Sequence, residues 1–241
     1  SFMSAGHTPD KDGPYRQTLT KAMDYLMSQQ KPDGDLRGRG RMYCHAIATL
    51  ALAEAALMTG DDRYRKAAAK GAEFIIKAQN PRTGGWRYAP GDPGDTSVVG
   101  WQVMALKSVE NLGYKIPDKT RAGALRWLDG VASGKQRMLA GYTGRSPTPA
   151  MTAEAAFSRM LLGVKPTDAQ VDEVTKYLLQ HPPGRGQHDV YCWYYCSLAL
   201  MQLQGEPWQQ WNDKMRDFLL KLQSTKGEAA GSWEPGKDRY G

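Results

Sequence analysis

The stretch Lys-Gly-Ala-Glu-Phe-Ile-Ile-Lys-Ala-Gln at residues 70–79, continued by Gly-Gly-Trp at 84–86, contains the strongest pattern in the chain. Its apolar residues recur at helical spacing, and the glycine pair predicts a turn after the helix. Two weaker copies end at Gln30 and Gln223, and in all three copies a lysine precedes the glutamine by nine residues. Gln79 follows Gln30 by 49 residues and precedes Gln223 by 144, which is three units of 48. A unit of this length holds two helices, so the sequence predicts a tandem of helix pairs.

Helical periodicity between the copies predicts two sets of helices. One set carries the glutamines, or Ala132 and Pro182 in two degenerate copies, and is predicted near residues 17–30, 62–79, 119–131, 167–181 and 206–223. The other set is more apolar and is predicted near 42–58, 97–111, 151–163 and 189–204. Helices that are apolar on most sides are buried on most sides, so we expect an inner layer of helices around a central cavity. The N-caps expected for the outer set are Asp61, Asp118 and Thr167.

Length and composition predict one globular domain. The 241 residues show no shift of composition that would divide them, and 41% are hydrophobic. No apolar run approaches the roughly 20 residues that cross a bilayer, so we expect a chain that does not span a membrane. The net charge of +7 includes Arg37, Arg39 and Arg41, interpreted as a solvated loop, with contact to phosphates or an acidic surface as the alternative. Most aromatic residues lie at helical positions and not along a basic stripe, which argues against nucleic-acid binding.

The three cysteines do not make a disulfide framework. Cys192 and Cys196 lie one turn apart in a single predicted helix, and Cys44 lies in another. We interpret all three as reduced, buried thiols. The cellular compartment is left open by this pattern.

Residues 70–79 with Gly84, Gly85 and Trp86 closely resemble the Gln-Trp repeat of squalene-hopene and oxidosqualene cyclases. The resemblance implies an α/α toroid of the terpene cyclase and prenyltransferase type. In such a repeat the glutamine bonds to helix-terminal backbone, and the tryptophan packs on the neighbouring unit. The positions expected to act in this way are Gln30, Gln79, Gly85, Trp86, Gln223 and Trp233.

The resemblance covers nearly the whole chain and predicts its domain organisation. Residues 1–16 are interpreted as a tag remnant and an N-terminal lead-in. Residues 17–241 are predicted to form a single terpene cyclase/prenyltransferase-like toroid domain. Because the stretch after Trp233 reads as a loop that follows an outer helix, we expect a domain truncated before a last inner helix.

An incomplete acidic motif lies at the start of the second inner helix. The cyclases that protonate squalene carry Asp-x-Asp-Asp-Thr there, and the middle aspartate donates the initiating proton. This chain has Asp92 and Asp95 but Gly94 in the middle place. The two carboxylates are interpreted as loop and cap groups, with catalysis as the alternative. The segment Thr152-Ala153-Glu154 resembles the Thr-Ala-Glu of oxidosqualene cyclases without the Asp-Cys that precedes it.

An aromatic wall is predicted at one level of the inner helices. Alignment on Leu50, Leu106, Arg159 and Leu198 brings His45, Trp101, Glu154 and Trp193 to equivalent positions, and Tyr43, Tyr191 and Tyr194 lie near them. Aromatic walls suit isoprenoids and carbocations. The alternative is that these side chains fill the core of a narrow ring. The candidate catalytic carboxylates are Asp92, Asp95, Glu154 and Asp189.

Other chemistries find less support. Protein prenyltransferases bind zinc through Asp, Cys and His, but the spacing of Asp189 and Cys192 does not match, so no metal is expected. Adjacent helical residues point about 100° apart, so Cys44 and His45 do not form a nucleophile–base pair. No glycine-rich phosphate loop follows a strand, and no cofactor is expected.

The leading hypothesis is a non-cyclising, squalene-cyclase-like repeat domain that acts in binding or assembly and holds an apolar, isoprenoid-like ligand in an aromatic central cavity. One alternative is a terpene cyclase or prenyltransferase-type enzyme with an isoprenoid substrate. Another is a carbohydrate-active toroid, which would need two carboxylates across a cleft. The expected partners are an apolar ligand, and a protein partner or further domains of a longer chain.

Overall fold

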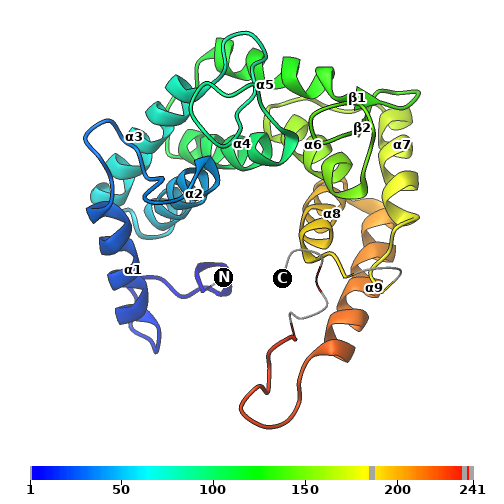
Figure 1. Cartoon of the computed structure of the whole chain (residues 1–241). Coiled ribbons are helices and arrows are strands. Elements are labelled where there is room, and N and C mark those ends of the chain that lie inside the picture. The colour runs from blue at the N-terminus through cyan, green and yellow to red at the C-terminus, as the bar shows by residue number, and fades with distance from the viewer. Residues whose placement is uncertain (1, 185–187, 235–237, 239–241) are drawn as a thin grey trace. The chain divides into compact units, whose positions relative to one another are not determined.

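The computed structural model describes residues 2–184, 188–234 and 238, and in these ranges the chain is all-α apart from a short two-stranded ribbon and one isolated bridge (Figure 1). A 3-10 turn at Met3–Ala5 precedes the helices. These are α1 Arg16–Ser28, α2 Met42–Thr59, α3 Asp62–Ala78, α4 Thr96–Asn111, α5 Asp118–Gly130, α6 Pro149–Leu161, α7 Asp168–Leu179, α8 Val190–Leu203 and α9 Gly205–Leu222. The ribbon pairs β1 Ala132–Ser133 with β2 Leu139–Ala140 in antiparallel register. The predicted all-α fold is confirmed, and each helix lies within a few residues of its expected range.

The chain forms two compact units, and the boundary falls within α5, between Trp127 and Leu128. In unit 1, up to Trp127, α2 packs against α3 and α4. In unit 2, from Leu128, α8 packs against α6 and α9. Figure 1 shows α2 beside α4 in the first unit and α6 beside α8 in the second. The organisation of residues 17–241 as one toroid stays a prediction.

The pattern of small and large apolar residues explains these packings. In α2 the alanines at 46, 53 and 55 are fully buried, and small side chains let neighbouring helices approach closely. In α3 the apolar residues lie on one stripe, so Ile75 is fully buried while the lysines face solvent. In unit 2, α6 is buried along almost its whole length, from Ala150 to Arg159. The more apolar helices are therefore the more buried ones, as the sequence predicts.

Two of the three expected N-caps are confirmed. The Asp61 carboxylate accepts from the Arg63 N–H (2.8 Å), and Thr167 forms a capping box with Gln170. Asp118 is instead the first residue of α5, and the Pro117 carbonyl accepts from Arg121 N–H at 3.2 Å. Because Pro117 has a fixed backbone angle suited to a helix entrance, the helix starts at Asp118 itself, one residue earlier than the aspartate signal suggests.

The glutamines that end the three best-matched segments bond to backbone. Gln30 Nε2 donates to the Ala67 carbonyl at 2.9 Å, and Gln79 Nε2 donates to the Thr120 carbonyl at 3.0 Å. Each bond joins the end of one outer helix to the outer helix that follows. Gln223 differs, because its Nε2 donates to Gly231 O within its own loop.

The indole of Trp86 forms a hydrogen bond to the helix that precedes it and not to the next helix pair. Its Nε1–H donates to the Ile75 carbonyl of α3 at 2.8 Å, and its side chain is fully buried. Trp233 Nε1–H makes the equivalent bond to Leu219 O of α9 at 2.8 Å, although 47% of Trp233 is exposed. The tryptophan hydrogen bonds therefore tie each loop to the helix that precedes it.

The thiols are free but differ in exposure. Cys192 and Cys196 are buried in α8, with their Sγ atoms 3.7 Å apart. Cys44 is exposed on α2, so the expectation of a third buried thiol is wrong. Its position on the uncovered side of α2 could not be read from the sequence, because α2 is apolar around most of its circumference.

Candidate functional site

An apolar face with two exposed side chains lies on the two packed helices α2 and α4 of unit 1. On α2 it carries Ile47, which is 44% exposed, and Met58, with half-buried Tyr43 one turn before Ile47. On α4 it carries half-buried Trp101 and Met104. These five residues are called the unit 1 face below.

A hydrogen bond joins the two stripes of the unit 1 face. Glu54 lies seven residues after Ile47 on α2, and Ser108 lies four residues after Met104 on α4, so each continues its stripe. Ser108 Oγ donates to Glu54 Oε1 at 2.6 Å. The two stripes therefore border one another along the contact between α2 and α4.

Unit 2 carries a smaller aromatic group on α8. Tyr194 is 42% exposed and Tyr191 is half-buried, whereas Tyr195 is fully buried between them. The Tyr195 ring packs edge-on against Tyr191 (centroids 5.0 Å apart) and Tyr194 (5.1 Å). Such edge-to-face pairs stabilise the arrangement by roughly 0.5–1.5 kcal/mol each beyond the burial of area.

A buried carboxylate stands beside these tyrosines. Glu154 of α6 is fully buried, and Tyr191 Oη donates to its Oε2 at 2.9 Å. Burial and the Glu154 carboxylate raise the pKa of both Tyr194 and Tyr195, so both phenols stay neutral. Among the four predicted carboxylates, Glu154 is thus brought together with a predicted aromatic residue, Tyr191.

The two aspartates of the incomplete motif have structural partners. Asp95 is fully buried at the start of α4, where it accepts from the Val98 N–H at 2.7 Å and faces Arg87 Nε at 3.4 Å. Asp92 Oδ2 accepts from the Ala89 N–H at 2.8 Å. One carboxylate caps the helix and the other closes the loop, and these arrangements match the structural interpretation of the pair.

The middle place of that motif has no room for a side chain. Gly94 has φ +123°, a conformation that residues with a Cβ rarely adopt. A Cβ on Gly94 would lie 2.9 Å from ring carbons of Trp127 and 3.0 Å from Gly85 Cα. The Trp127 indole therefore occupies the space into which an acid at this position would extend.

Three other predicted site residues lie in packed or capping positions. His45 is fully buried between α2 and α3, where Nδ1 accepts from the Leu36 N–H and Nε2–H donates to the Gly71 carbonyl, both at 3.0 Å. Trp193 is buried edge-on against Phe218 of α9, with centroids 5.3 Å apart. Asp189 caps α8 by accepting from the Cys192 N–H. Residues that lie at the same level along their helices thus point in different directions around the helix axes.

His45 makes the stability of the fold depend on pH. Burial lowers its pKa below the ordinary value of about 6.5, because the charged imidazolium loses its hydration there. The bond from the Leu36 N–H also requires an Nδ1 without a proton. The stabilisation is complete above the unfolded pKa and is lost as the pH falls through the folded one. We expect the melting temperature to fall more between pH 7 and pH 5 in the native chain than in His45→Gln.

The glutamine variant is the matched control, because its amide offers one acceptor and one donor but does not titrate. Burial acts to raise the pKa of Asp35, but its bonds to Arg37 and Lys31 lower it overall, and such carboxylates contribute equally in both proteins. Differential scanning fluorimetry at both pH values gives the comparison. Equal pH slopes in the two proteins would contradict the role of His45.

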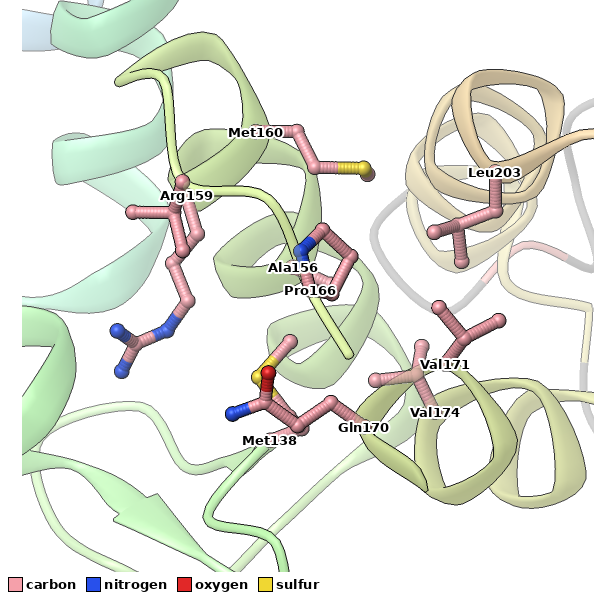
Figure 2. Close-up of a pocket in the computed structure, with 10 residues that line it drawn as sticks. Met138, Ala156, Arg159, Met160, Pro166, Gln170, Val171, Val174 and Leu203 are labelled. Carbon is pink, nitrogen blue, oxygen red and sulfur yellow. The ribbon is translucent and has the colours of Figure 1, made fainter. Parts of the chain in front are cut away.

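A pocket of unit 2 is too small for an isoprenoid. It lies between α6 and α7 and is lined by apolar side chains such as Met160, Val171 and Val174 (Figure 2). Its volume of about 10 Å³ corresponds to one water molecule. A second, wide depression of about 460 Å³ lies over α7 and is lined mostly by polar residues, among them Lys135, Glu173 and Lys176. The first pocket is too small and the second too polar to hold an apolar ligand, and a central cavity stays a prediction.

Within the described ranges, no group of three or more His, Cys, Asp or Glu side chains could hold a metal ion. Among the same residues, one helix, Met42–Thr59, is long and apolar enough to cross a membrane by length and composition. This helix is α2, half of which is buried against its neighbours. The core helix of a folded domain has the same length and composition, so the finding is consistent with a chain that does not span a membrane.

The residues that sequence reasoning missed on the unit 1 face are Ile47, Met58 and Met104. Hydrophobic periodicity marks helices but does not separate an uncovered apolar stripe from a buried one when the helix is apolar on nearly all sides. The position of the neighbouring helices was the missing information.

Comparison with curated proteins finds a partial similarity to a terpene synthase. Over 103 residues the chain is 32% identical to the drimenyl diphosphate synthase of Streptomyces showdoensis, a match that covers 42% of this chain and 19% of that synthase. The matched part thus spans about a fifth of the relative. No protein-family model matches the chain. The similarity supports a distant, partial relationship to a terpene synthase.

Proposed function

We propose that this chain is a terpenoid-cyclase-like domain that binds an isoprenoid or similar apolar chain on the unit 1 face and does not start cyclisation by protonation. The observation that carries the proposal is Gly94. It stands where the resembling cyclases have their proton donor, and its φ of +123° and its contacts with Trp127 exclude a side chain. The packing around position 94 thus excludes an acidic side chain, so the difference from those cyclases is more than a single substitution.

Binding is supported by the chemistry of the unit 1 face. Tyr43 and Trp101 offer aromatic surface, and Ile47 and Met58 offer exposed aliphatic surface on the same helix pair. Burial of apolar area is worth about 25 cal/mol per Å². A flexible apolar chain that covers Ile47 and Met58 would remove their exposed apolar area from water.

The repeat and the toroid are part of the same proposal. The two carbonyls that accept from Gln30 and Gln79 belong to equivalent positions, because Ala67 precedes Gln79 by 12 residues and Thr120 precedes Ala132 by 12. Equivalent bonds at successive helix pairs support a Gln-Trp repeat over residues 17–241. An assembly role within a longer protein is the corresponding proposal for the domain as a whole.

The binding test compares two exposed apolar residues. We expect farnesol to quench the tryptophan fluorescence of the full chain, and Ile47→Ser to weaken that binding by about 5- to 10-fold, since part of a buried side chain is worth roughly 1 kcal/mol. Leu220→Ser is the matched control, because Leu220 is 60% exposed on outer helix α9. Equal effects of the two substitutions, or no binding by the native chain, would refute the proposed face.

A terpene cyclase that uses Glu154 is the second candidate, favoured by its burial and its bond from Tyr191. Incubation of the native chain with squalene or farnesyl diphosphate, followed by gas chromatography and mass spectrometry, distinguishes the two. We expect no cyclic product. A cyclic product that disappears in Glu154→Gln would establish the enzyme and remove the non-cyclising part of the proposal. The carbohydrate-active alternative has no observation in its favour.

A further inference from the structure

Two buried thiols face each other on one helix of unit 2. Cys192 and Cys196 lie one turn apart on α8, and their Sγ atoms share a weak hydrogen bond at 3.7 Å. Cys196 is fully buried, and 6% of Cys192 is exposed. The third cysteine, Cys44, is exposed on α2 in unit 1. The chain therefore has one preformed pair of thiols and one single thiol.

The spacing of the pair suits a bridging atom better than a disulfide. A disulfide brings the two Cβ atoms to roughly 3.5–4.5 Å from each other. Residues four apart on a helix have Cβ atoms about 5–6 Å apart, so a direct bond between the sulfurs would distort α8. A single bridging atom with two bonds of about 2.3 Å, the length of a zinc–thiolate bond, spans about 3.5–3.8 Å at ordinary bond angles. The observed Sγ–Sγ distance of 3.7 Å matches such a bridge.

Burial favours a bridging atom that binds without charging the site. The hydrogen bond with Cys192 and burial raise the pKa of the Cys196 thiol, so this thiol stays protonated. A divalent metal ion would have to displace thiol protons into solvent and would usually take further ligands. In the ranges that the structure describes, no group of three or more His, Cys, Asp or Glu side chains is arranged to supply them. A compound of trivalent arsenic with two exchangeable hydroxyl groups needs only the two thiols.

We propose that Cys192 and Cys196 form a chelating site for organic compounds of trivalent arsenic. Phenylarsine oxide, hydrated in water to its dihydroxide, exchanges both hydroxyl groups for the two sulfurs. Two As–O bonds and two S–H bonds break, two As–S bonds form, and two water molecules leave. Arsenic stays trivalent, neither sulfur is oxidised, and the product is neutral, as a buried site requires. The inference is independent of the proposed function, because the pair lies in unit 2 and the apolar face lies in unit 1.

The start of α8 gives the ligand its route to the buried pair. Helix α8 begins at Val190, so Cys192 lies in the first turn and is the more exposed of the two thiols. Helix ends open locally at a lower free energy than helix centres. Once Cys192 holds the arsenic, the bond to Cys196 forms within one molecule, at a high effective concentration of the second thiol. We therefore expect slow but tight binding, and faster reaction of thiol reagents with the exposed Cys44.

The test adds phenylarsine oxide to the reduced full chain in excess 2-mercaptoethanol and measures the bound arsenical by intact mass spectrometry. We expect the folded chain to gain one phenylarsenic group with loss of two hydrogens. Cys192→Ala and Cys196→Ala should each lower the apparent affinity at least about 100-fold, because a chelate is replaced by a single thiol. Cys44→Ala is the control and should bind as the native chain does. Circular dichroism checks that each variant is helical.

Three results would overturn the site. Binding that is lost in Cys44→Ala and kept in Cys192→Ala belongs to the exposed thiol. Binding that occurs only after unfolding in guanidinium chloride means that the folded pair is closed to the arsenical. The third result needs no variant and decides the question even if an alanine variant does not fold. An arsenical that 2-mercaptoethanol removes from the native chain as readily as 2,3-dimercaptopropanol does is held by one sulfur, whereas one that only the dithiol removes is held by two.

Discussion

Replacement of Gly84 by alanine is expected to lower the free energy of unfolding by at least about 3 kcal/mol, whereas Gly91→Ala lowers it by about 1 kcal/mol. The two glycines have nearly the same backbone angle, φ +79° and +80°. They differ in what a Cβ would meet. At Gly84 it would lie 2.0 Å from the carbonyl oxygen of Gly123 in α5, and at Gly91 it would meet nothing within 4 Å.

The comparison isolates the close approach of two backbones. The strain of an alanine at positive φ is common to both variants, so the difference between them reports the contact of the loop after α3 with α5. Urea unfolding followed by far-ultraviolet circular dichroism gives both values. Similar losses in the two variants would mean that the backbones separate at little cost, and the structural account of the glycine pair would be wrong.

The contact of Gly84 with Gly123 shows why the helix boundaries could be predicted from the sequence and the contacts between helix pairs could not. The period of about 48 residues located each helix from apolar spacing alone, and α3 and α9 end within a residue of the expected glutamine. The sequence also marks Gly84 as a turn residue. Nothing in the pattern indicates that Gly123, within a helix, leaves room for it, because such a contact joins positions 39 residues apart.

The candidate site was predicted less completely, for a geometric reason. Alignment of the inner helices gave the level of His45, Glu154 and Trp193 along the helices, and all three are buried. Their directions differ, because His45 bonds toward α3 and Trp193 packs on α9. Glu154 was associated with the tyrosines of α8, and the bond from Tyr191 agrees with that association.

Trp86→Ala is expected to destabilise the chain by about 3–5 kcal/mol, and Trp233→Ala by no more than about 1 kcal/mol. Both indoles donate to the carbonyl four residues before the glutamine of their segment, at 2.8 Å in each case. Only Trp86 is fully buried, so its removal leaves a cavity where the loop packs on α3, whereas Trp233 is 47% exposed. The two variants therefore separate the stability that comes from the buried ring from the stability that comes from the hydrogen bond, which both tryptophans make.

Trp86→Phe completes the comparison, because it keeps most of the ring and leaves the Ile75 carbonyl without its indole donor. We expect it to cost about 1 kcal/mol, as for a hydrogen bond lost in a buried site. Chemical denaturation of the three variants under one condition measures all the differences. If Trp233→Ala lowered the free energy of unfolding as much as Trp86→Ala, the hydrogen bond would contribute more than the burial of the ring. The tryptophan would then stabilise its helix pair equally in both segments. A large effect confined to Trp86 instead means that the segment at 70–86 holds unit 1 together while its counterpart at Trp233 adds little.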